Sequence, residues 1–405
     1  MTRLLFPEAY GVMSLVWAML YGLQMFSDVG LAAAIIRDKR GDDPRFLNTA
    51  WTLSVCRGVL LSVLACLIAY PMSLYYHEPQ LSRLLPVAGL TAIMAGFQST
   101  AMFTCRRQID LKRLTLLELA TEIVMFIVLV TWAYLSPTVW ALVGGAVVAQ
   151  LFLTLATHAY LPGPRNRFQW ERSSLLTLMN FGKWIFLSSA VYFLSTQGDR
   201  MLLGHYLDMA HLGVYGIAVL LSDAVQSLVL KINSGVLFPA FGRVVLNEPD
   251  RLRSFVSRTR LAIDVALVLP TAILMMLGGH VVALLYDVRY HEAGWMFRIL
   301  CIRLLMVCTL SNSENCLVSL GHPQYSVMHN VLRAIWILGG IPLGWSRYGI
   351  EGVVWAVALS EIPVVVVIWA GMARHRMLSL KSELRSLVFV GTGALVGIGL
   401  LNLLH

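Results

Sequence analysis

The sequence predicts an all-α polytopic membrane protein with about twelve transmembrane spans arranged in two lobes. Of the 405 residues, 58% are apolar and 13% are charged. Soluble domains contain roughly 25% charged residues, so this chain has about half the usual share. Apolar stretches long enough to cross a hydrocarbon core of roughly 30 Å recur along the whole length. These stretches are continuous and do not alternate every second residue, which favours helices over the strands of a membrane barrel.

Twelve spans follow from the apolar runs, and turn or charge signals separate them. Examples of these signals are Asp42-Asp43-Pro44, Ser136-Pro137 and Gly321-His322-Pro323. The spans cover roughly residues 10–35, 48–70, 84–104, 115–134, 138–160, 181–204, 213–238, 260–277, 295–318, 326–346, 351–372 and 386–404.

Lysine and arginine gather in every second loop, except at the short turn around Gly321. They concentrate at residues 37–45, 106–113, 165–183, 243–260 and 374–385, whereas the alternate loops hold Arg3, Arg83, Arg289 and Arg347. By the positive-inside rule, the loops rich in basic residues are cytoplasmic. The net charge of +9 therefore reflects these loops, and we expect no nucleic-acid partner.

An internal repeat relates the two lobes. Residues 7–20 (PEAYGVMSLVWAML) align at an offset of 202 with residues 209–222 (MAHLGVYGIAVLLS), and each copy places a Gly-Val pair at the entry to an apolar span. The second copy follows a complete span at residues 181–204, whereas no span precedes the first copy. The charge pattern also puts the N-terminus outside, so we expect that a first span is missing. In transporters built from repeats, the substrate site lies between the repeated lobes.

The break at Pro162-Gly163-Pro164 divides the chain. Residues 1–160 form the predicted N-terminal lobe, and residues 161–182 form a cytoplasmic linker that we expect to include an amphipathic helix. Residues 183–372 form the C-terminal lobe. Residues 373–405 add a cytoplasmic loop and an extra C-terminal span.

Six basic residues fall inside the predicted spans: Arg57, Arg200, Lys231, Arg298, Arg303 and Arg333. An uncompensated charge at the centre of a span costs roughly 2.5–3.5 kcal/mol on insertion scales. Arg298 lies one turn from the outer end of its span and can extend to the interface. Arg200 follows Asp199, which offers it a local salt bridge.

The basic residues other than Arg298 predict a cationic cavity for an anionic headgroup such as a diphosphate. Arginine suits phosphate through its forked donors, and lysine acts as a point charge. This substrate-binding set consists of Arg57, Arg200, Lys231, Arg303 and Arg333. The structural alternative is that these side chains form ion pairs with neighbouring helices.

Acidic side chains also lie inside or at the edge of the spans. Asp28, Asp223 and Glu361 are the deepest, and Glu314 lies eleven residues after Arg303, which returns to nearly the same helical face. These four acids either couple transport to protons or Na⁺ or pair with the basic residues for structural reasons.

The sequence contains no P-loop, HExxH or GxSxG pattern, and its longest stretch outside the spans is too short for a catalytic domain. The six cysteines lack CxxC spacing and mostly lie within apolar runs, where packing explains them. We therefore expect no enzyme activity, no catalytic residues, no cofactor and no metal site.

Several segments match the pattern of a known family. They are Arg3–Met13 (RLLFPEAYGVM), Phe26–Leu31 (FSDVGL), Arg107–Arg113, Val139–Val143, Asp199–Gly204 (DRMLLG) and Leu212–Tyr215. In these segments the sequence resembles the Wzx-type polysaccharide flippases. The superfamily of these flippases also includes the multidrug (MATE) exporters and the lipid II flippase. The likeness covers nearly the whole chain and is strongest before residue 245.

The resemblance implies a MATE-like fold and a flippase that moves undecaprenyl-diphosphate-linked oligosaccharide repeat units from the cytoplasmic to the periplasmic leaflet by alternating access. It implies a multi-pass protein of the bacterial inner membrane that serves O-antigen, capsule or exopolysaccharide synthesis. The implied partners are the lipid-linked substrate, membrane lipids, and the polysaccharide polymerase and chain-length machinery. The sequence departs from the family by lacking its first helix and a further C-terminal span present in some members.

Two alternatives remain open at this point. A MATE-like exporter of drugs or other small molecules should have an acidic or aromatic cavity. A membrane-embedded polysaccharide polymerase or ligase should have a sizeable periplasmic loop, whereas the longest outer loop, residues 278–293, is short.

Overall fold

The computed structural model describes residues 5–26, 40–108, 110–163 and 166–404, together with Leu31 and Ile35. The described residues form helices joined by short turns, with no strand among them. Eight of the described helices are long and apolar enough to cross a membrane, or nine if the bent pair Leu81–Gly96 and Ala101–Arg107 is one span. The predicted all-α polytopic membrane fold is confirmed. The predicted number of twelve spans is not, and the missing first span stays a prediction.

The chain divides into two compact units. Unit 1 comprises Met1–Phe193 and Leu203–Gly213, and unit 2 comprises Leu194–Leu202 and Val214–His405. All three boundaries, after residues 193, 202 and 213, fall within the helices α8 (Arg172–Tyr206) and α9 (Met209–Ile232), so these two helices contribute to both units.

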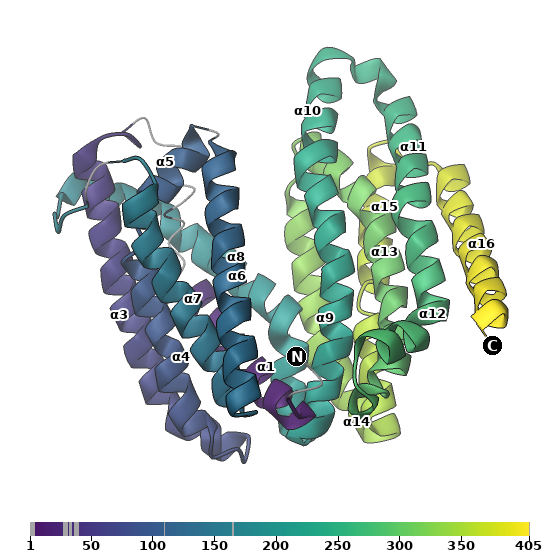
Figure 1. Cartoon of the computed structure of the whole chain (residues 1–405). Coiled ribbons are helices and arrows are strands. Elements are labelled where there is room, and N and C mark those ends of the chain that lie inside the picture. Colours follow the sequence, from purple (N-terminus) through teal and green to yellow (C-terminus); the bar gives the residue numbers. More distant parts are fainter. Residues whose placement is uncertain are drawn as a thin grey trace. The chain divides into compact units, whose positions relative to one another are not determined.

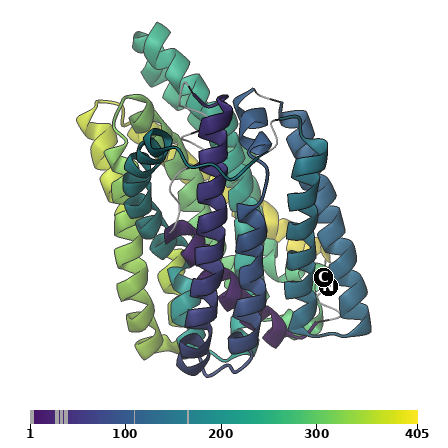
Figure 2. The same cartoon turned by 90° about the vertical axis from the view of Figure 1, so that its left-hand side faces the viewer.

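Unit 1 is built on a tightly packed helical hairpin. Its helices are α1 (Pro7–Phe26), α3 (Pro44–Tyr75), α4 (Leu81–Gly96), α5 (Ala101–Arg107), α6 (Leu111–Leu135) and α7 (Val139–Tyr160). Helices α3 and α4 run side by side (Figures 1 and 2). A Cβ atom at Gly58 would lie 2.4 Å from the Ala92 carbonyl oxygen, and one at Gly96 would lie 2.6 Å from the Ser54 carbonyl oxygen. Glycine therefore permits the close approach of the two backbones.

Helix α3 starts where the sequence predicts a break. The Asp43 side chain accepts a hydrogen bond from the Arg45 backbone N–H, and Pro44 occupies the first turn, where its missing N–H is not needed. The helix continues past Pro71 to Tyr75, beyond the predicted end at residue 70.

The described part of the predicted linker is extended before it becomes helical. Residues 166–171 lie along α3, where the Arg167 backbone N–H donates to Asn48 and the Gln169 backbone N–H donates to Thr52. Helix α8 then starts at Arg172 and runs without interruption through the predicted span at 181–204. The helical end of the linker is therefore continuous with that span.

The two copies of the sequence repeat meet at a helix crossing within unit 1. A Cβ atom at Gly11 of α1 would lie 1.9 Å from the Met209 carbonyl oxygen, and one at Gly213 of α9 would lie 1.9 Å from the Pro7 carbonyl oxygen. Pro7 and Met209 are separated by the same 202 positions as Gly11 and Gly213. The contact is therefore reciprocal under the offset that aligns the two copies.

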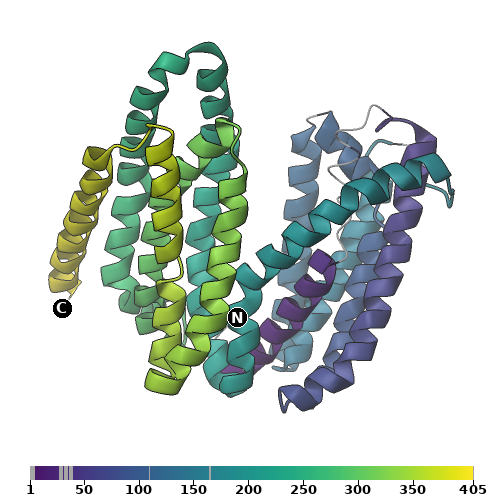
Figure 3. The same ribbon diagram turned by 180° about the vertical axis from the view of Figure 1, so that it is seen from behind.

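Unit 2 contains the remaining described helical segments. They are η1 (Asn233–Leu237), α10 (Phe238–Asn247), η2 (Pro249–Arg251), α11 (Leu252–Ile263), η3 (Asp264–Val268), α12 (Leu269–Leu285), η4 (Val288–Tyr290), α13 (Ala293–Ser319), α14 (Gln324–Ala358), α15 (Ile362–Arg374) and α16 (Leu380–Leu404). The turn between α10 and α11 extends beyond the other helices of this unit (Figure 1), and α15 and α16 are on the near side when the unit is seen from behind (Figure 3).

Two prolines explain the wide turns in unit 2. The π-helical segments η1 and η3 end just before Pro239 and Pro270. Proline lacks the N–H that would bond to the fourth preceding carbonyl and its ring crowds that carbonyl, so a wider turn accommodates it.

The predicted spans 326–346 and 351–372 correspond to α14 and α15. The chain bends within α14 and again between α14 and α15. Helix α14 reverses at Gly349, which has φ 58° and ψ −137°, and continues to Ala358 before a turn leads into α15. The returning backbone packs closely on the first half, since a Cβ at Gly344 would lie 2.5 Å from the Gly352 carbonyl oxygen. The span predicted at 351–372 is therefore divided by a turn at residues 359–361.

Helix α16 is held to unit 2 by a buried ionic cluster. Arg260, with 2% exposure, donates hydrogen bonds to Ser386 and Glu383 of α16 and to the Thr309 carbonyl. Asp264 is fully buried and lies 3.6 Å from the Arg260 Nε atom. The charge pattern predicts Arg260 in a cytoplasmic loop, but this residue lies on α11 and its side chain is buried in the helical core.

Candidate functional site

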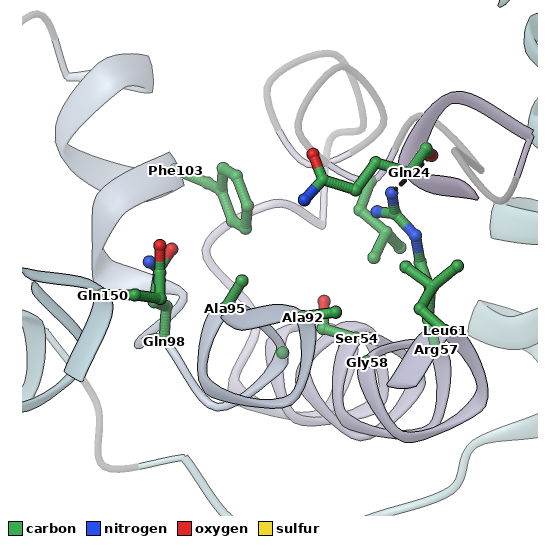
Figure 4. A pocket seen from close by; sticks show the side chains of 12 residues that line it. Gln24, Ser54, Arg57, Gly58, Leu61, Ala92, Ala95, Gln98, Phe103 and Gln150 are labelled. Carbon is green, nitrogen blue, oxygen red and sulfur yellow. Dashed lines mark hydrogen bonds between the residues drawn. The ribbon is translucent and has the colours of Figure 1, made fainter. Parts of the chain in front are cut away.

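Unit 1 contains a polar cavity of about 390 Å³ between its helices (Figure 4). The cavity lies within the roughly 300–1,000 Å³ range of small-ligand sites. Its described lining is Gln24, Leu31, Ser54, Arg57, Gly58, Leu61, Ala92, Ala95, Gly96, Gln98, Phe103 and Gln150. Small residues of α3 and α4 form one wall, because the close packing of these helices leaves no room for larger side chains.

The polar groups of the cavity come from four helical regions. Arg57 of α3 donates from one terminal nitrogen to the Gln24 backbone carbonyl at 2.9 Å. Figure 4 shows Gln24 and Arg57 on one side of the space and Gln98 and Gln150 on the other. The Gln150 Nε2 atom is buried and has no hydrogen-bond partner in the part of the chain that the structure describes.

A fixed bend between α4 and α5 places Gln98 and Phe103 at the cavity. The two helices meet at 59°. The Asn166 carboxamide oxygen accepts hydrogen bonds from the Ser99 hydroxyl and the Thr100 N–H, each at 3.1 Å, and its amide donates to the Thr100 hydroxyl at 2.7 Å. The segment that follows α7 therefore fixes the bend in α4–α5.

Unit 2 contains a row of interacting charged and polar side chains from α8, α9 and α13. Arg200 pairs with Asp223 at 2.9 Å, and the Asp199 carboxylate accepts a hydrogen bond from the Tyr215 hydroxyl at 2.6 Å. Arg303 of α13 donates to the Gln226 side chain at 3.0 Å. The Arg303 Nε atom has no hydrogen-bond partner among the described residues.

A second group in unit 2 centres on His329 of α14. Its Nδ1 atom lies 3.0 Å from a Glu314 oxygen, and its Nε2 atom lies 3.1 Å from a Glu361 oxygen. Arg333, one turn further along α14, lies 3.6 Å from the other Glu361 oxygen. Glu361 is fully buried at the start of α15, so the group connects α13, α14 and α15 inside the unit.

The residues predicted to form a cationic cavity occur in both units. Arg57 lines the cavity of unit 1, whereas Arg200 and Arg333 lie in unit 2 beside the carboxylates of Asp223 and Glu361. The Lys231 side chain is exposed on α9. For Arg200 and Arg333 the geometry therefore matches the structural alternative of ion pairing. Asp28 lies outside the described residues.

Sequence reasoning missed His329, Gln98 and Gln150. His329 and Arg333 are four residues apart on a helix and therefore share a face, which is a signal that the sequence contains. Gln98 and Gln150 are uncharged, so the positions of charged residues inside the spans do not indicate them. Any buried amide inside an apolar span needs a partner, and that requirement could have identified them.

The long apolar helices define the class of protein, a multi-pass helical membrane protein. The family model described as "Polysaccharide biosynthesis protein" matches residues 1–294. The chain belongs to this family, and the family resemblance predicted from its sequence is confirmed.

Two relatives illustrate the match. The lipopolysaccharide biosynthesis protein WzxC of Escherichia coli is 21% identical over 89% of this chain and 73% of its own length. The succinoglycan biosynthesis transport protein ExoT of Rhizobium meliloti is 20% identical over 64% of this chain and 52% of its own length. The chain thus spans about half the length of ExoT and a larger share of WzxC.

Two solved structures show the fold. The lipid II flippase MurJ in an inward closed conformation has a TM-score of 0.73 at 10% identity and covers 97% of this chain and 91% of its own. A MATE multidrug transporter in an inward-facing conformation has a TM-score of 0.70 at 15% identity. The match covers 96% of this chain and 92% of the transporter chain. The predicted MATE-like fold is confirmed. The chain is a polysaccharide biosynthesis protein with the fold of these transporters.

Proposed function

We propose that this protein is a flippase that moves undecaprenyl-diphosphate-linked oligosaccharides from the cytoplasmic to the periplasmic leaflet of the bacterial inner membrane. The observation that carries the proposal is the position of Arg57. It lies inside an apolar helix and lines a cavity whose described residues include no carboxylate. A charged side chain inside a membrane helix is costly unless it is paired or lines a polar pathway.

An arginine in such a cavity suits a phosphate-containing headgroup. The guanidinium presents several donors in a fixed plane, and phosphate oxygens accept them in pairs. The headgroup can occupy the cavity while the polyprenyl chain stays in the bilayer. Membership in a family of polysaccharide biosynthesis proteins supports a headgroup that also carries sugars.

The direction of transport rests on the charge pattern. The cavity residues Gln98 and Phe103 lie close in sequence to Arg106 and Arg107, which belong to a loop assigned to the cytoplasm. The cavity therefore lies toward the side where lipid-linked sugars are assembled. Arg303 and Lys231 remain in the proposal as further cationic groups in unit 2, and the polymerase and chain-length machinery remain proposed partners.

The test is a deletion strain that carries an empty vector, the wild-type gene, or the gene with Arg57→Gln or Arg57→Lys. The measured quantity is the share of undecaprenyl-diphosphate-linked repeat units in each leaflet. We expect cytoplasmic accumulation with the empty vector and with Arg57→Gln, relief by the wild-type gene, and partial relief by Arg57→Lys. If repeat units reach the periplasm without the gene, the proposal is wrong.

The fold is shared with multidrug transporters, so export of small molecules is the second candidate. A cavity for cationic drugs should contain a carboxylate, and the described lining of the unit 1 cavity has none. The same strains can be compared for resistance to cationic dyes. Raised resistance with normal leaflet distribution of repeat units would favour the exporter.

A further inference from the structure

We infer that a cavity in unit 2, among α12, α13 and α16, binds the phosphate of an anionic lipid headgroup. The cavity has a volume of about 370 Å³, which lies within the range of small-ligand sites. Its described lining includes three basic side chains, His280, His291 and Arg298, and no carboxylate. The inference concerns a different unit from the Arg57 cavity and does not depend on the proposed function.

Glycines of α12 and α13 shape one side of this cavity. A Cβ atom at Gly294 of α13 would lie 2.9 Å from the Gly279 Cα atom, so the two backbones touch at this point. A Cβ atom at Gly278 would lie 2.7 Å from the Arg298 Cγ atom, so glycine leaves room for the aliphatic stem of this arginine against α12. Arg298 and His280 therefore line one cavity although they belong to different helices.

Helix α16 closes another side of the cavity. A Cβ atom at Gly393 would lie 2.7 Å from the Ala272 Cβ atom, and one at Gly397 would lie 2.7 Å from the Met276 Cβ atom, so α16 packs against α12 at these two glycines. Leu401 follows one turn further along α16 and lines the cavity together with Met276. The cavity thus combines an apolar side with a basic one, as a lipid headgroup and the start of its acyl chains require.

The basic side chains lie at the depth of lipid phosphates. The positive-inside rule assigns the connection between α12 and α13 to the exterior. His280 lies five residues before the end of α12 at Leu285, and Arg298 lies five residues after the start of α13 at Ala293. At 1.5 Å per residue this is about 7.5 Å, close to the headgroup layer of roughly 5–8 Å on each side of the hydrocarbon core. Met276 lies one turn deeper, toward the acyl chains.

The donors of the cavity match a phosphate group. Arginine presents several N–H donors in a fixed plane, and phosphate oxygens accept them in pairs. A histidine ring has at least one N–H donor in either protonation state. Arg298 supplies a permanent positive charge, and His280 and His291 add imidazole rings from two other positions around the same space. One phosphate between these three side chains would compensate the charge of Arg298.

The absence of a carboxylate from the described lining restricts the class of headgroup. Asp287 in the neighbouring loop is paired with Arg289 at 2.8 Å, and Glu292 is exposed and outside the described lining. The described lining therefore offers no anionic partner for the ammonium group of phosphatidylcholine or phosphatidylethanolamine. A headgroup with a phosphate and no cation fits better, and phosphatidylglycerol is such a headgroup.

The test measures binding of short-chain lipids to the purified, delipidated full-length protein in detergent by native mass spectrometry. The probes are dioctanoyl phosphatidylglycerol, dioctanoyl phosphatidylcholine, farnesyl diphosphate and inorganic phosphate. Arg298→Gln removes the permanent charge, and Ala283→Trp fills the cavity from an exposed lining position of α12. Thermal unfolding confirms that each variant is folded.

Each variant has a matched control in unit 2. Arg347→Gln changes an exposed arginine of α14 that lines a different cavity, which it shares with the carboxylate of Glu351. Leu284→Trp places the same large side chain one residue further along α12, at a position that is 79% exposed and outside the described lining.

We expect the wild type to bind phosphatidylglycerol more tightly than phosphatidylcholine. Arg298→Gln should weaken phosphatidylglycerol binding roughly 10-fold or more, as expected for loss of a hydrogen bond between charged groups, and should remove the preference over phosphatidylcholine. Ala283→Trp should also weaken phosphatidylglycerol binding, and neither control should change it. If Arg298→Gln does not fold, Ala283→Trp with its control carries the test.

Equal binding of the two phospholipids by the wild type would overturn the inference. So would an equal effect of each variant and its matched control on phosphatidylglycerol binding. Displacement of phosphatidylglycerol by inorganic phosphate at equal concentration would also overturn the assignment to a lipid. If farnesyl diphosphate binds more tightly than phosphatidylglycerol and this binding depends on Arg298, the inference holds and the anionic lipid is a diphosphate lipid.

Discussion

Gly11 of α1 and Gly213 of α9 lie against each other at one helix crossing, with each glycine facing the backbone of the opposite helix. Gly11 faces Met209 and Gly213 faces Pro7, and both pairs are related by the offset of 202 that aligns the two sequence repeats. Gly213 is the equivalent of Gly11, and Pro7 is the equivalent of Met209. Such a reciprocal contact between equivalent positions is typical of two elements related by a two-fold axis. The repeat is thus visible in the packing of the backbone.

Alanine at either glycine should disturb this crossing. The added methyl group would lie 1.9 Å from a carbonyl oxygen, so the helices must separate. Overpacking of this kind costs about 1–3 kcal/mol. We expect Gly11→Ala and Gly213→Ala to lower the thermal unfolding midpoint in detergent by several degrees. Gly242→Ala is the control, since a Cβ atom there meets nothing within 4 Å, and an equal loss in this control would contradict the explanation.

Glu361 should be needed for the stability of unit 2. Its carboxylate is fully buried beside His329 and Arg333, so Glu361→Leu leaves a buried cation without its partner. Removing one member of a buried pair typically costs about 3–5 kcal/mol. The measurement is the amount of folded protein in the membrane and its thermal midpoint, with the exposed Glu351→Leu on α14 as control.

A double variant separates pairing from transport in this group. If Glu361 serves only to compensate Arg333, then Glu361→Leu combined with Arg333→Met should restore much of the stability lost in the single variant. Restored stability together with normal transport would show that this pair is structural. Restored stability without transport would instead assign Glu361 or Arg333 a part in the transport cycle.

Arg260 should be needed to keep α16 docked. Arg260→Met would leave Glu383 without its cation, whereas Asp264 keeps Arg385 at 3.3 Å, and we expect a loss of about 3–5 kcal/mol. Limited proteolysis in the 375–379 connection checks this, because a detached α16 should be cleaved faster. Arg258→Met changes an exposed arginine on the same helix and should leave the cleavage rate as in the wild type.

Asn166 should act as a positioning residue for the unit 1 cavity. Its carboxamide holds the α4–α5 bend through Ser99 and Thr100, and that bend places Gln98 and Phe103. We expect Asn166→Ala to raise the cytoplasmic share of undecaprenyl-diphosphate-linked repeat units, as Arg57→Gln should, at an unchanged protein level. Asn247→Ala, at an exposed position of α10, should leave this share as in the wild type. A wild-type leaflet distribution with Asn166→Ala would mean that the bend has only a structural role.

The fold class, the approximate positions of the helices and the family could all be predicted from the order of the residues. Long apolar runs require helices in a membrane, and this requirement holds before any tertiary contact forms. The repeat at an offset of 202 also followed from the sequence, because each copy keeps a glycine at its entry to an apolar span. Arg57 was found in the same way, since a charge inside an apolar run stands out.

Only the tertiary structure decided which polar groups meet. The sequence predicts how deep Arg200, Arg303 and Arg333 lie within their spans, but it does not predict which side chains surround them. Arg200 and Arg333 pair with the carboxylates of Asp223 and Glu361 on other helices, whereas Arg57 lines a cavity in unit 1. Likewise, Gln98 and Gln150 become a candidate site only because the α4–α5 bend and α7 bring them together. Depth along a helix is a local property, whereas pairing is set by helix packing, which the order of residues alone does not specify.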